Sequence, residues 1–561
     1  MKAFKLYTII CTALLLTSCS KDFLDRTPGV TLPEDAVFTD PVLASQYAIS
    51  AYAYLVDDYV RFDDHRGTTS QASDEAVSGN LDRSVLYLNQ GLFHDHSERV
   101  ASLNDIVNVW DREYQGIAIT NMMLSKMATV PWTSIQNPAR IEGETRFLRA
   151  FFYFELIKRF GGVPIIDRVY GVNEDIDLPR ASYNDCVKFI MADLEKAETQ
   201  LPRAEDLPLA ENGRATIGAA KALKARVLLY AASALNNESN DLSKWAQAAA
   251  AAKAVMDLGT YSLQPTYKDI LNVTSSTEYI MMKVRSTRVN TDGKIIDFAQ
   301  SPGSGGANGQ MNPTQNHVDL YEMTNGKAIA DPTSGYDQQR PYANRDPRLT
   351  WNVIYNDENY QSRKIEMWSQ NNANGTVTYG KDYNANNIIY TATRYYCRKY
   401  WPEVYINRVA GATYLNFLFF RYAEVLLNYA EAQNEAVGPD ASVYDAINQI
   451  RARGDVNMPP LPLGLTKDQM RERIRNERAV ELAFEDHRWY DIMRWKKGPE
   501  IVAQPVYGMN VIKNANGSFT YSKVLLGSNY QKVFRDYMHR YPIPRTEIYK
   551  SKGKLVQNTG W

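Results

Sequence analysis

The sequence predicts a mainly α-helical protein, in which tetratricopeptide-like helix pairs form a scaffold that carries an irregular, partly β insertion. Apolar side chains recur at helical spacing over residues 100–260, and this pattern returns after residue 420. Between them, residues 262–417 lose the spacing and become rich in Gly, Asn, Pro, Thr and Tyr. Because the sequence contains no strict repeat of about 34 residues, an irregular helical bundle is the alternative.

The N-terminus has the pattern of a bacterial lipoprotein signal peptide covering residues 1–18. Lys2 and Lys5 precede an apolar stretch at 6–17, which is shorter than the roughly 20 residues that a membrane-spanning helix needs. The stretch ends in Leu16-Thr17-Ser18-Cys19. In signals of this type the cysteine becomes the acylated N-terminus, so we predict lipidation of Cys19. An ordinary secretory signal with a chance cysteine is the alternative.

Residues 19–40 predict a lipidated tether, because they contain two prolines and a glycine and show little periodicity. The helical scaffold is expected to start at Asp40-Pro41 and to extend over residues 41–261, since proline is favoured in the first helical turn. Residues 57–98 interrupt it with a polar, irregular segment. Long loops of this kind inside a compact protein are usually functional or disordered.

The strongest helical signal in the scaffold lies in residues 144–160. Phe147, Phe151 and Phe154 repeat at spacings of four and three and form part of a wide apolar arc. This arc predicts a helix packed on much of its circumference, and Gly161 to Pro164 predict where it stops. Further helices are predicted at 182–200, at the Ala-rich segment 216–235, and at 245–258.

The insertion at 262–417 contains one clear local signal, a hairpin turn predicted at Asn374-Gly375. Helical periodicity returns in the C-terminal part, residues 418–561. There, helices are predicted at 421–436, 441–453 and 467–496, followed by a coil-rich tail.

Composition excludes some classes of protein. The formal net charge is -1, from 63 basic and 64 acidic residues, which argues against nucleic-acid binding. Once the signal peptide is removed and Cys19 is acylated, only Cys186 and Cys397 remain, so a disulfide-stapled fold is excluded. Whether these two cysteines pair stays open. The 37 Tyr and 9 Trp suit cores, interfaces and sugar faces alike.

The densest ionisable cluster, residues 475–494, is expected to be structural. Three pairs, Arg478–Glu481, Glu485–Arg488 and Asp491–Arg494, are spaced three apart, so each can form an ion pair on one helix. Paired carboxylates beside a histidine suit acid–base chemistry as well. However, the EDHRW segment lacks the second histidine of a zinc-binding HExxH helix.

No catalytic, cofactor or metal site emerges from the remaining motifs. His94 and His96 lack a third ligand, and the acidic residues at 57–64 lack the EF-hand spacing. The Gly-rich segment at 303–309 has no following Lys-Ser or Lys-Thr, and no GxSxG motif occurs. Cys397 has no evident base nearby. We therefore predict a protein that is not an enzyme and has no cofactor and no recognisable metal site, while the binding of a Ca²⁺ ion stays open.

Several segments together resemble the SusD/RagB family of outer-membrane lipoproteins, and they occur in order over almost the whole chain. They are Ser20–Gly29, Glu144–Pro164, Gly213–Ala232, Asn344–Leu349, Arg421–Glu435, Ile474–Trp495, Tyr541–Ile548 and the terminal QNTGW. The resemblance implies an all-α fold with tetratricopeptide-like helix pairs, lipid anchoring at the outer membrane facing the cell surface, and a SusC-like TonB-dependent transporter as partner.

The resemblance also implies a function in nutrient capture. We expect a glycan-binding lipoprotein that delivers oligosaccharide to the transporter. A peptide-binding RagB-like lipoprotein shares every scaffold motif and is the alternative. A hydrolase is a further alternative, but it needs a carboxylate or serine site that the sequence does not show.

Ligand-binding residues are expected on loops held by the scaffold, where functional residues concentrate. Aromatic residues in regular helices are set aside as core: Trp110, Phe147, Phe151, Tyr422 and Trp489. Two loop regions, 60–98 and 286–375, are predicted to meet and to share one surface. Their candidates are Tyr87, Phe93 and His96 near Asp74 and Arg83, and Arg288, Asn308, Tyr336, Tyr360, Trp368 and Asn372. Trp368 is the first choice as a sugar platform, with a packed loop anchor as the alternative.

Overall fold

The computed structural model describes most of the chain from residue 33 onward. The described residues are 33–56, 59–62, 67–79, 84–92, 107–171, 173–174, 178–268, 270–283, 299, 301–305, 309–401, 403 and 415–561. The predicted signal peptide, Cys19 and most of the tether lie outside these residues, as do Phe93, His96, Arg288 and Asn308.

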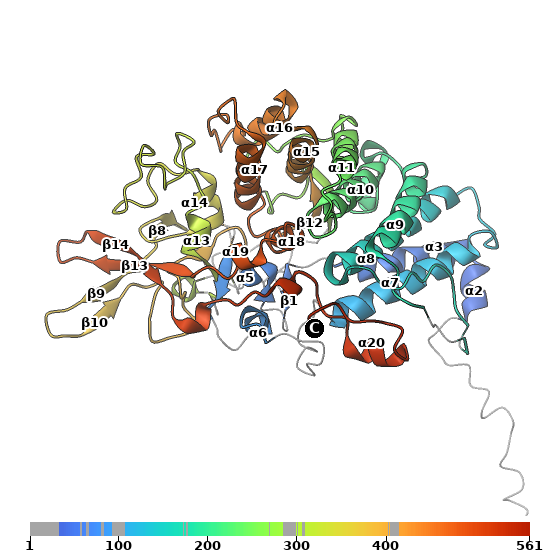
Figure 1. Ribbon diagram of the computed structural model, residues 1–561, viewed down its shortest axis with the longest axis horizontal. Helices are drawn as coiled ribbons and strands as arrows, with labels where there is room; N and C mark the ends of the chain where they lie inside the picture. Colours follow the sequence, from blue (N-terminus) through green and yellow to red (C-terminus); the bar gives the residue numbers. More distant parts are fainter. Residues whose placement is uncertain are drawn as a thin grey trace, which may run out of the picture.

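The helical scaffold is an array in which neighbouring helices pack side by side. Its longer helices are α3 (Pro41–Ser50), α7 (Val107–Lys126), α8 (Pro138–Phe160), α9 (Tyr183–Glu198), α10 (Ile217–Ala232), α11 (Leu242–Met256), α15 (Tyr422–Val437), α16 (Ala441–Arg451) and α17 (Lys467–Glu481). Each of α7 to α10 packs on the next helix, α11 packs on α15, and α15 contacts both α16 and α17. Figure 1 shows these helices as an arc from α3 and α7 to α17.

The described part of the chain also contains short helices. They are α2 (Glu34–Phe38), α5 (Thr69–Ala72), α6 (Ser84–Asn89), α13 (Gln315–Val318), α14 (Arg348–Asn352), α18 (Arg488–Arg494), α19 (Gly498–Ile501) and α20 (Arg545–Lys550). Because α11 packs directly on α15, the array continues across the irregular segment that separates these two helices in the chain. The mainly α, tetratricopeptide-like fold predicted from the sequence is confirmed.

Helix α8 shows why this array forms. The Asn137 side chain accepts a hydrogen bond from the Arg140 amide and caps the helix start, beside Pro138 at the first helical position. Phe147, Phe151 and their neighbours are buried almost completely, as the wide apolar arc predicted. The helix ends at Gly161, whose φ of 76° is readily adopted by glycine.

The strands are short and mostly paired in twos. They are β1 (Val60–Phe62), β2 (Gly67–Thr68), β3 (Ala76–Ser78), β4 (Tyr279–Lys283), β5 (Met311–Pro313), β6 (Val353–Ile354), β7 (Asn359–Tyr360), β8 (Arg363–Lys364), β9 (Ser369–Asn371), β10 (Val377–Tyr379), β11 (Tyr396–Cys397), β12 (Phe417–Arg421), β13 (Tyr507–Lys513) and β14 (Phe519–Leu525). The largest sheet has the order β10-β9-β13-β14 and lies at the opposite end of the molecule from α3.

Hairpins form both halves of this sheet. Strands β9 and β10 enclose the predicted turn at Asn374-Gly375, and Gly375 has a φ of 81°, so that prediction is confirmed. The antiparallel pair β13–β14 comes from the C-terminal tail, which we expected to be mostly coil. Its strands combine buried and exposed positions less regularly than an alternating pattern would, and this weakens the sequence signal.

The helix predicted over residues 467–496 is interrupted. Helix α17 ends at Glu481 and α18 starts at Arg488. Phe484 and Asp486, in the connection, have φ values of 62° and 67°, which a continuous helix cannot contain. The interruption turns α18 away from the axis of α17 and changes which charges can meet.

The ion pairs of this segment are therefore mostly tertiary. Asp491–Arg494 forms as predicted, at 2.8 Å. The predictions of the Arg478–Glu481 and Glu485–Arg488 pairs are wrong. Arg478 pairs with Asp491 at 2.9 Å, and Arg488 pairs with Asp74 at 2.8 Å. The general prediction, that this cluster is structural ion pairing, holds.

Glu481 is the centre of the buried charge cluster. Its carboxylate accepts hydrogen bonds from Arg421 and Arg453, each at 2.8 Å, and from Arg348 at 3.1 Å. Burial raises the pKa of a carboxyl group, but the three guanidiniums outweigh burial and hold the pKa of Glu481 well below its usual value. The cluster joins β12, α14, α17 and the segment directly after α16, so it ties the irregular segment to the helical array.

Two further features bear on function. Cys186 and Cys397 are both buried and free. Across the described ranges, no helix is both long and apolar enough to span a membrane, and no group of three or more His, Cys, Asp or Glu side chains is arranged to hold a metal ion.

Candidate ligand-binding site

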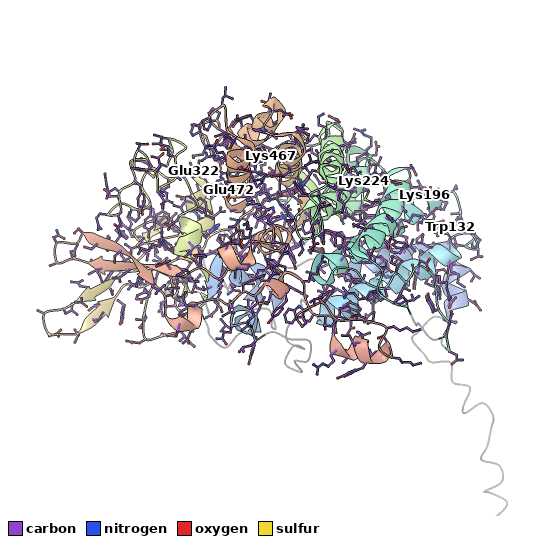
Figure 2. The ribbon with its side chains drawn as sticks, in the orientation of Figure 1. Trp132, Lys196, Lys224, Glu322, Lys467 and Glu472 are labelled. Carbon is purple, nitrogen blue, oxygen red and sulfur yellow. The ribbon has the colours of Figure 1, made fainter. Side chains whose placement is uncertain are left out.

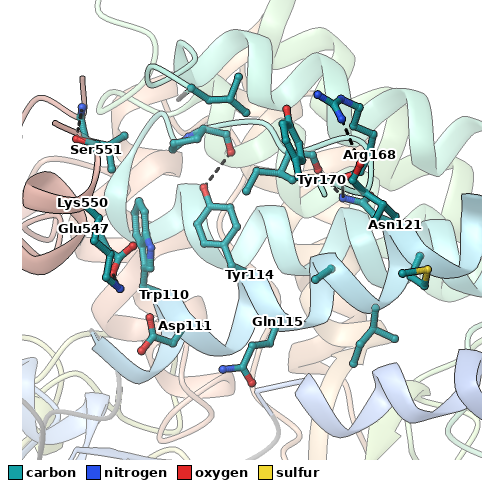
Figure 3. Close-up of a pocket in the computed structure, with 18 of the residues that line it drawn as sticks. Trp110, Asp111, Tyr114, Gln115, Asn121, Arg168, Tyr170, Glu547, Lys550 and Ser551 are labelled. Carbon is teal, nitrogen blue, oxygen red and sulfur yellow. Dashed lines mark hydrogen bonds and ion pairs between the residues drawn. The ribbon is translucent and has the colours of Figure 1, made fainter. Parts of the chain in front are cut away.

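A cavity with a volume of about 710 Å³ opens beside α7, between α3 and α20. Figure 3 shows its lining. Four aromatic residues contribute to the wall: Tyr47 from α3, Trp110 and Tyr114 from α7, and Tyr170 from the segment after α8. Its volume lies within the range of about 300–1,000 Å³ that is typical of ligand pockets.

Helix α7 supplies the floor of the cavity through its 3.6-residue periodicity. Trp110 and Tyr114 lie one turn apart, as do Asp111 and Gln115, so two aromatic and two polar side chains occupy neighbouring positions on one face. The Trp110 ring packs against Tyr114 and Phe160, each with ring centroids 5.1 Å apart. This packing orients the floor before any ligand arrives.

The second wall is the segment that follows α8. The Tyr114 hydroxyl donates a hydrogen bond to the Pro164 carbonyl at 2.9 Å, and the Asn121 amide donates to the Ile166 carbonyl at 2.8 Å. Tyr153 accepts a hydrogen bond from the Ile166 amide at 2.7 Å. Because three side chains of α7 and α8 hold this backbone, the wall is preformed.

The third wall comes from the C-terminal end of the chain. Helix α20 and the residues after it contribute Glu547, Lys550, Ser551 and Leu555 to the lining. Arg180 anchors the terminal segment by donating to the Val556 carbonyl at 2.8 Å and to the Asn558 side chain at 2.9 Å. Residues more than 400 positions apart thus form one cavity.

Charged groups lie at the rim. Lys550 pairs with Glu547 at 2.6 Å, and Arg168 donates to Glu174 at 3.1 Å while its guanidinium lies 3.8 Å from the Tyr170 ring centroid. Partial burial raises the pKa of Asp111, and the nearby Glu547 raises it further. The rim therefore combines two paired cations with the Asp111 carboxylate, which lies close enough to Glu547 to be affected by its negative charge.

This arrangement favours binding rather than hydrolysis. Flat rings on an apolar wall can cover the C–H face of a sugar or an apolar side chain of a peptide, and rim groups can bind the polar edge. A glycoside hydrolase needs one carboxyl that stays protonated, which usually requires burial. Asp111 is only partly buried and Glu547 is bound to Lys550, so neither is the enclosed carboxyl group that this role requires.

Comparison with known proteins identifies the family. Residues 273–561, more than half of the chain, match the sequence model described as the SusD family. The chain belongs to the SusD family. Residues 22–229 match a second SusD-like model, described as starch-binding associating with outer membrane.

Relatives of the SusD family match over nearly their full length. A curated SusD-like protein of Formosa agariphila is 24% identical, with 100% of both chains covered. A crystal structure of a SusD-like protein from Bacteroides fragilis is 27% identical, with a TM-score of 0.75, covering 94% of this chain and 99% of that chain. A laminarin-binding SusD-like protein has a TM-score of 0.60 at 21% identity, covering 93% and 100%. The last similarity concerns the fold alone.

Two residues that we expected in the ligand site of this SusD-family protein are core residues instead. Tyr360 is 1% exposed and packs edge-on against Trp401, with ring centroids 5.0 Å apart. Trp368 is 8% exposed, and the Lys513 ammonium lies 4.3 Å from its ring centroid. Tyr360 is covered by packing within the insertion, whereas Trp368 is covered in part by β13 of the C-terminal part.

The other described candidates have different surroundings. The Asn372 side chain donates to the hydroxyls of Thr376 and Thr378 and so closes its own hairpin turn. Tyr336 is half-buried, with the Arg345 guanidinium 5.5 Å from its ring centroid. Tyr87, on α6, is 39% exposed.

The two loop regions meet, as predicted, although through buried strands, so their sharing of one ligand-binding surface stays a prediction. Strand β3 pairs antiparallel with β5, with Val77 opposite Asn312, and the Thr314 amide donates to the Glu75 carbonyl at 3.0 Å. The Asp74 carboxylate forms an ion pair with Arg488. None of the described candidates from these regions lines the cavity beside α7.

Sequence reasoning missed the cavity residues for an identifiable reason. Trp110 was set aside as helical core, and it is buried, yet one side of it lines the cavity. The pairs Trp110–Tyr114 and Asp111–Gln115 were the available signal, since they place rings beside polar groups on one helix face. Many core helices share that pattern, and only the position of α20 encloses a cavity over it.

Proposed function

We propose that this protein is a non-catalytic, lipid-anchored binding protein of the outer membrane, which captures a glycan and delivers it to a SusC-like TonB-dependent transporter. The observation that carries the proposal is an aromatic-lined cavity in a chain of the SusD family. The second matching model, described as starch-binding associating with outer membrane, supports both ligand class and location. A neighbouring structure named as a laminarin-binding protein supports a glycan as well.

The anchor and the partner follow from the same proposal. Acylation of Cys19 would hold the protein at the membrane, because two or more acyl chains anchor stably where a single chain does so only marginally. A protein that binds a nutrient outside the barrier needs a channel to pass it on. We therefore expect co-purification with a TonB-dependent transporter in mild detergent, and migration as a solitary species beside that transporter would contradict this part.

The ligand is tested by calorimetric titration with maltoheptaose, laminarihexaose and a peptide library. We expect binding of a glycan without turnover and no binding of peptides. Selective peptide binding would instead establish the RagB-like alternative, and release of shorter sugars would establish a hydrolase.

The cavity is tested by substituting a half-buried ring of its wall. Tyr47→Ala removes one aromatic face, and a stacked aromatic contact contributes about 1 kcal/mol, so affinity should fall about fivefold. Tyr549→Ala is the matched control, because Tyr549 is 69% exposed on α20 and is not part of the lining. Equal affinities of parent, Tyr47→Ala and Tyr549→Ala would place the ligand elsewhere.

A further inference from the structure

The cations at the cavity already have internal partners. Lys550 is paired with Glu547 on α20, and Arg168 is paired with Glu174 while it covers Tyr170. Each cation would have to give up a carboxylate of the protein before it could bind an anionic ligand. The lining therefore offers no pre-organised anion site of the kind that paired or converging guanidiniums provide.

Two polar side chains on the floor of the cavity form no hydrogen bond with the described residues. The Asp111 carboxylate and the Gln115 amide are exposed, lie one helical turn apart, and have no hydrogen-bond partner among the described residues. Figure 3 shows both on the same stretch of α7 as Trp110 and Tyr114. Together they can accept hydrogen bonds from neighbouring sugar hydroxyls and donate one in return.

Asp111 is the carboxylate of the lining that has no paired cation in the described part of the chain. The lining itself contains two carboxylates, Asp111 and Glu547, and two cations, Lys550 and Arg168, but Lys550 pairs with Glu547 and Arg168 pairs with Glu174 outside the lining. Because the paired groups largely cancel, Asp111 dominates the potential that a ligand meets over the floor. Sulfate or carboxylate groups placed there face repulsion, whereas hydroxyl groups face an acceptor.

We propose that this cavity selects neutral oligosaccharides against sulfated or uronate-containing ones, and that Asp111 is the residue that sets this selectivity. The inference rests on the proposed function, since it concerns the same cavity. It adds the chemical class of the glycan and the group that discriminates. Ligand hydroxyls bind Asp111 and Gln115 while the sugar C–H face lies on the aromatic wall.

The experiment compares matched pairs of ligands that share one backbone. Laminarihexaose and maltoheptaose are each titrated beside their chemically sulfated forms, by calorimetry at low ionic strength. We expect the neutral member of the binding pair to bind at least about tenfold more tightly than its sulfated form. Added salt should reduce this ratio, because it screens an exposed charge.

Substitution then assigns the selectivity. Asp111→Asn should raise the affinity for the sulfated ligand about tenfold and change the neutral ligand less than about threefold, since the amide keeps an acceptor. Asp468→Asn is the control, because this exposed aspartate lies on α17, far along the array from α7. Circular dichroism verifies that both variants are folded.

The outcomes separate the inference from the function. Equal or tighter binding of the sulfated form by the parent protein, weakened about fivefold in Tyr47→Ala, overturns the neutral selectivity and keeps the glycan-binding cavity. If Asp111→Asn leaves the ratio of the affinities for the neutral and the sulfated ligand unchanged, the role of Asp111 is overturned. Absence of binding to every member of the pairs overturns the proposed function itself.

Discussion

Replacing Glu481 with Gln tests whether the buried charge cluster holds the scaffold to the insertion. The substitution keeps the shape of the side chain and removes the negative charge that three guanidiniums share, at 2.8, 2.8 and 3.1 Å. Glu481 is 0% exposed, so water cannot replace the lost charge. Breaking a buried ion pair from one side costs about 3–5 kcal/mol, and we expect a loss of unfolding free energy in that range.

The control lies on the same helix. Glu472 of α17, labelled in Figure 2, has a side chain that is 70% exposed and pairs with Arg475 at 2.9 Å. Surface pairs with a spacing of three or four contribute about 0.5 kcal/mol or less, so Glu472→Gln should leave stability almost unchanged.

The assay is urea unfolding followed by circular dichroism, because urea, unlike guanidinium, does not screen charges. We compare midpoints and slopes of parent, Glu481→Gln and Glu472→Gln. The reasoning is refuted if Glu481→Gln loses less than about 1 kcal/mol, or if both variants lose the same amount. Either result would mean that other groups are sufficient to balance the positive charges of the three arginines when the Glu481 carboxylate is absent.

Three other predictions follow from burial, charge and the N-terminal signal. Trp368→Ala should cost about 3–5 kcal/mol in urea unfolding and leave glycan affinity unchanged, since its ring is core; weaker binding at full stability would restore it to the site. Burial opposes the ionised form of Glu424, but Arg226 outweighs it and lowers the pKa to about 2. Since this pKa lies below the ordinary value of 4.5 for a glutamate, Glu424 should contribute about 3 kcal/mol above pH 4.5, lost as pH falls towards 2. Thermal melts from pH 2 to 7 should therefore show a flatter acid limb for Glu424→Gln than for the parent. Cys19→Ala should move the protein from the membrane to the soluble fraction, and identical fractionation of parent and variant, with no lipid on either, would exclude acylation.

Local sequence patterns were sufficient to predict features whose residues are neighbours both in sequence and in space. The apolar arc of α8, its end at Gly161 and the Asn374-Gly375 turn depend on contacts within a few residues, and all three were predictable. The Asp491–Arg494 pair belongs to the same class, because both residues lie on one turn of α18.

Distant contacts decided the rest. Glu481 lies near Arg478 in sequence, but positive φ angles in the connection redirect α18 and Arg478 pairs with Asp491 of that helix. Arginines from three distant segments reach Glu481 instead. Trp368 lies in a loop-rich segment, yet strands from residues 507–525 build a sheet beside it and cover its ring. Hydrophobic burial is not directional, so sequence position alone does not show which side of a ring stays open.

The sequence by itself determined the family, the order of the scaffold helices and the nature of the charged cluster as structural. These depend on spacing along the chain, which a helix or a tight turn converts directly into geometry. Only the tertiary structure decided where a ligand can bind. Tyr47, Trp110 and Lys550 come from three distant parts of the chain, and the cavity between them exists because packing of the helical array leaves α7 partly uncovered and brings α20 to its edge.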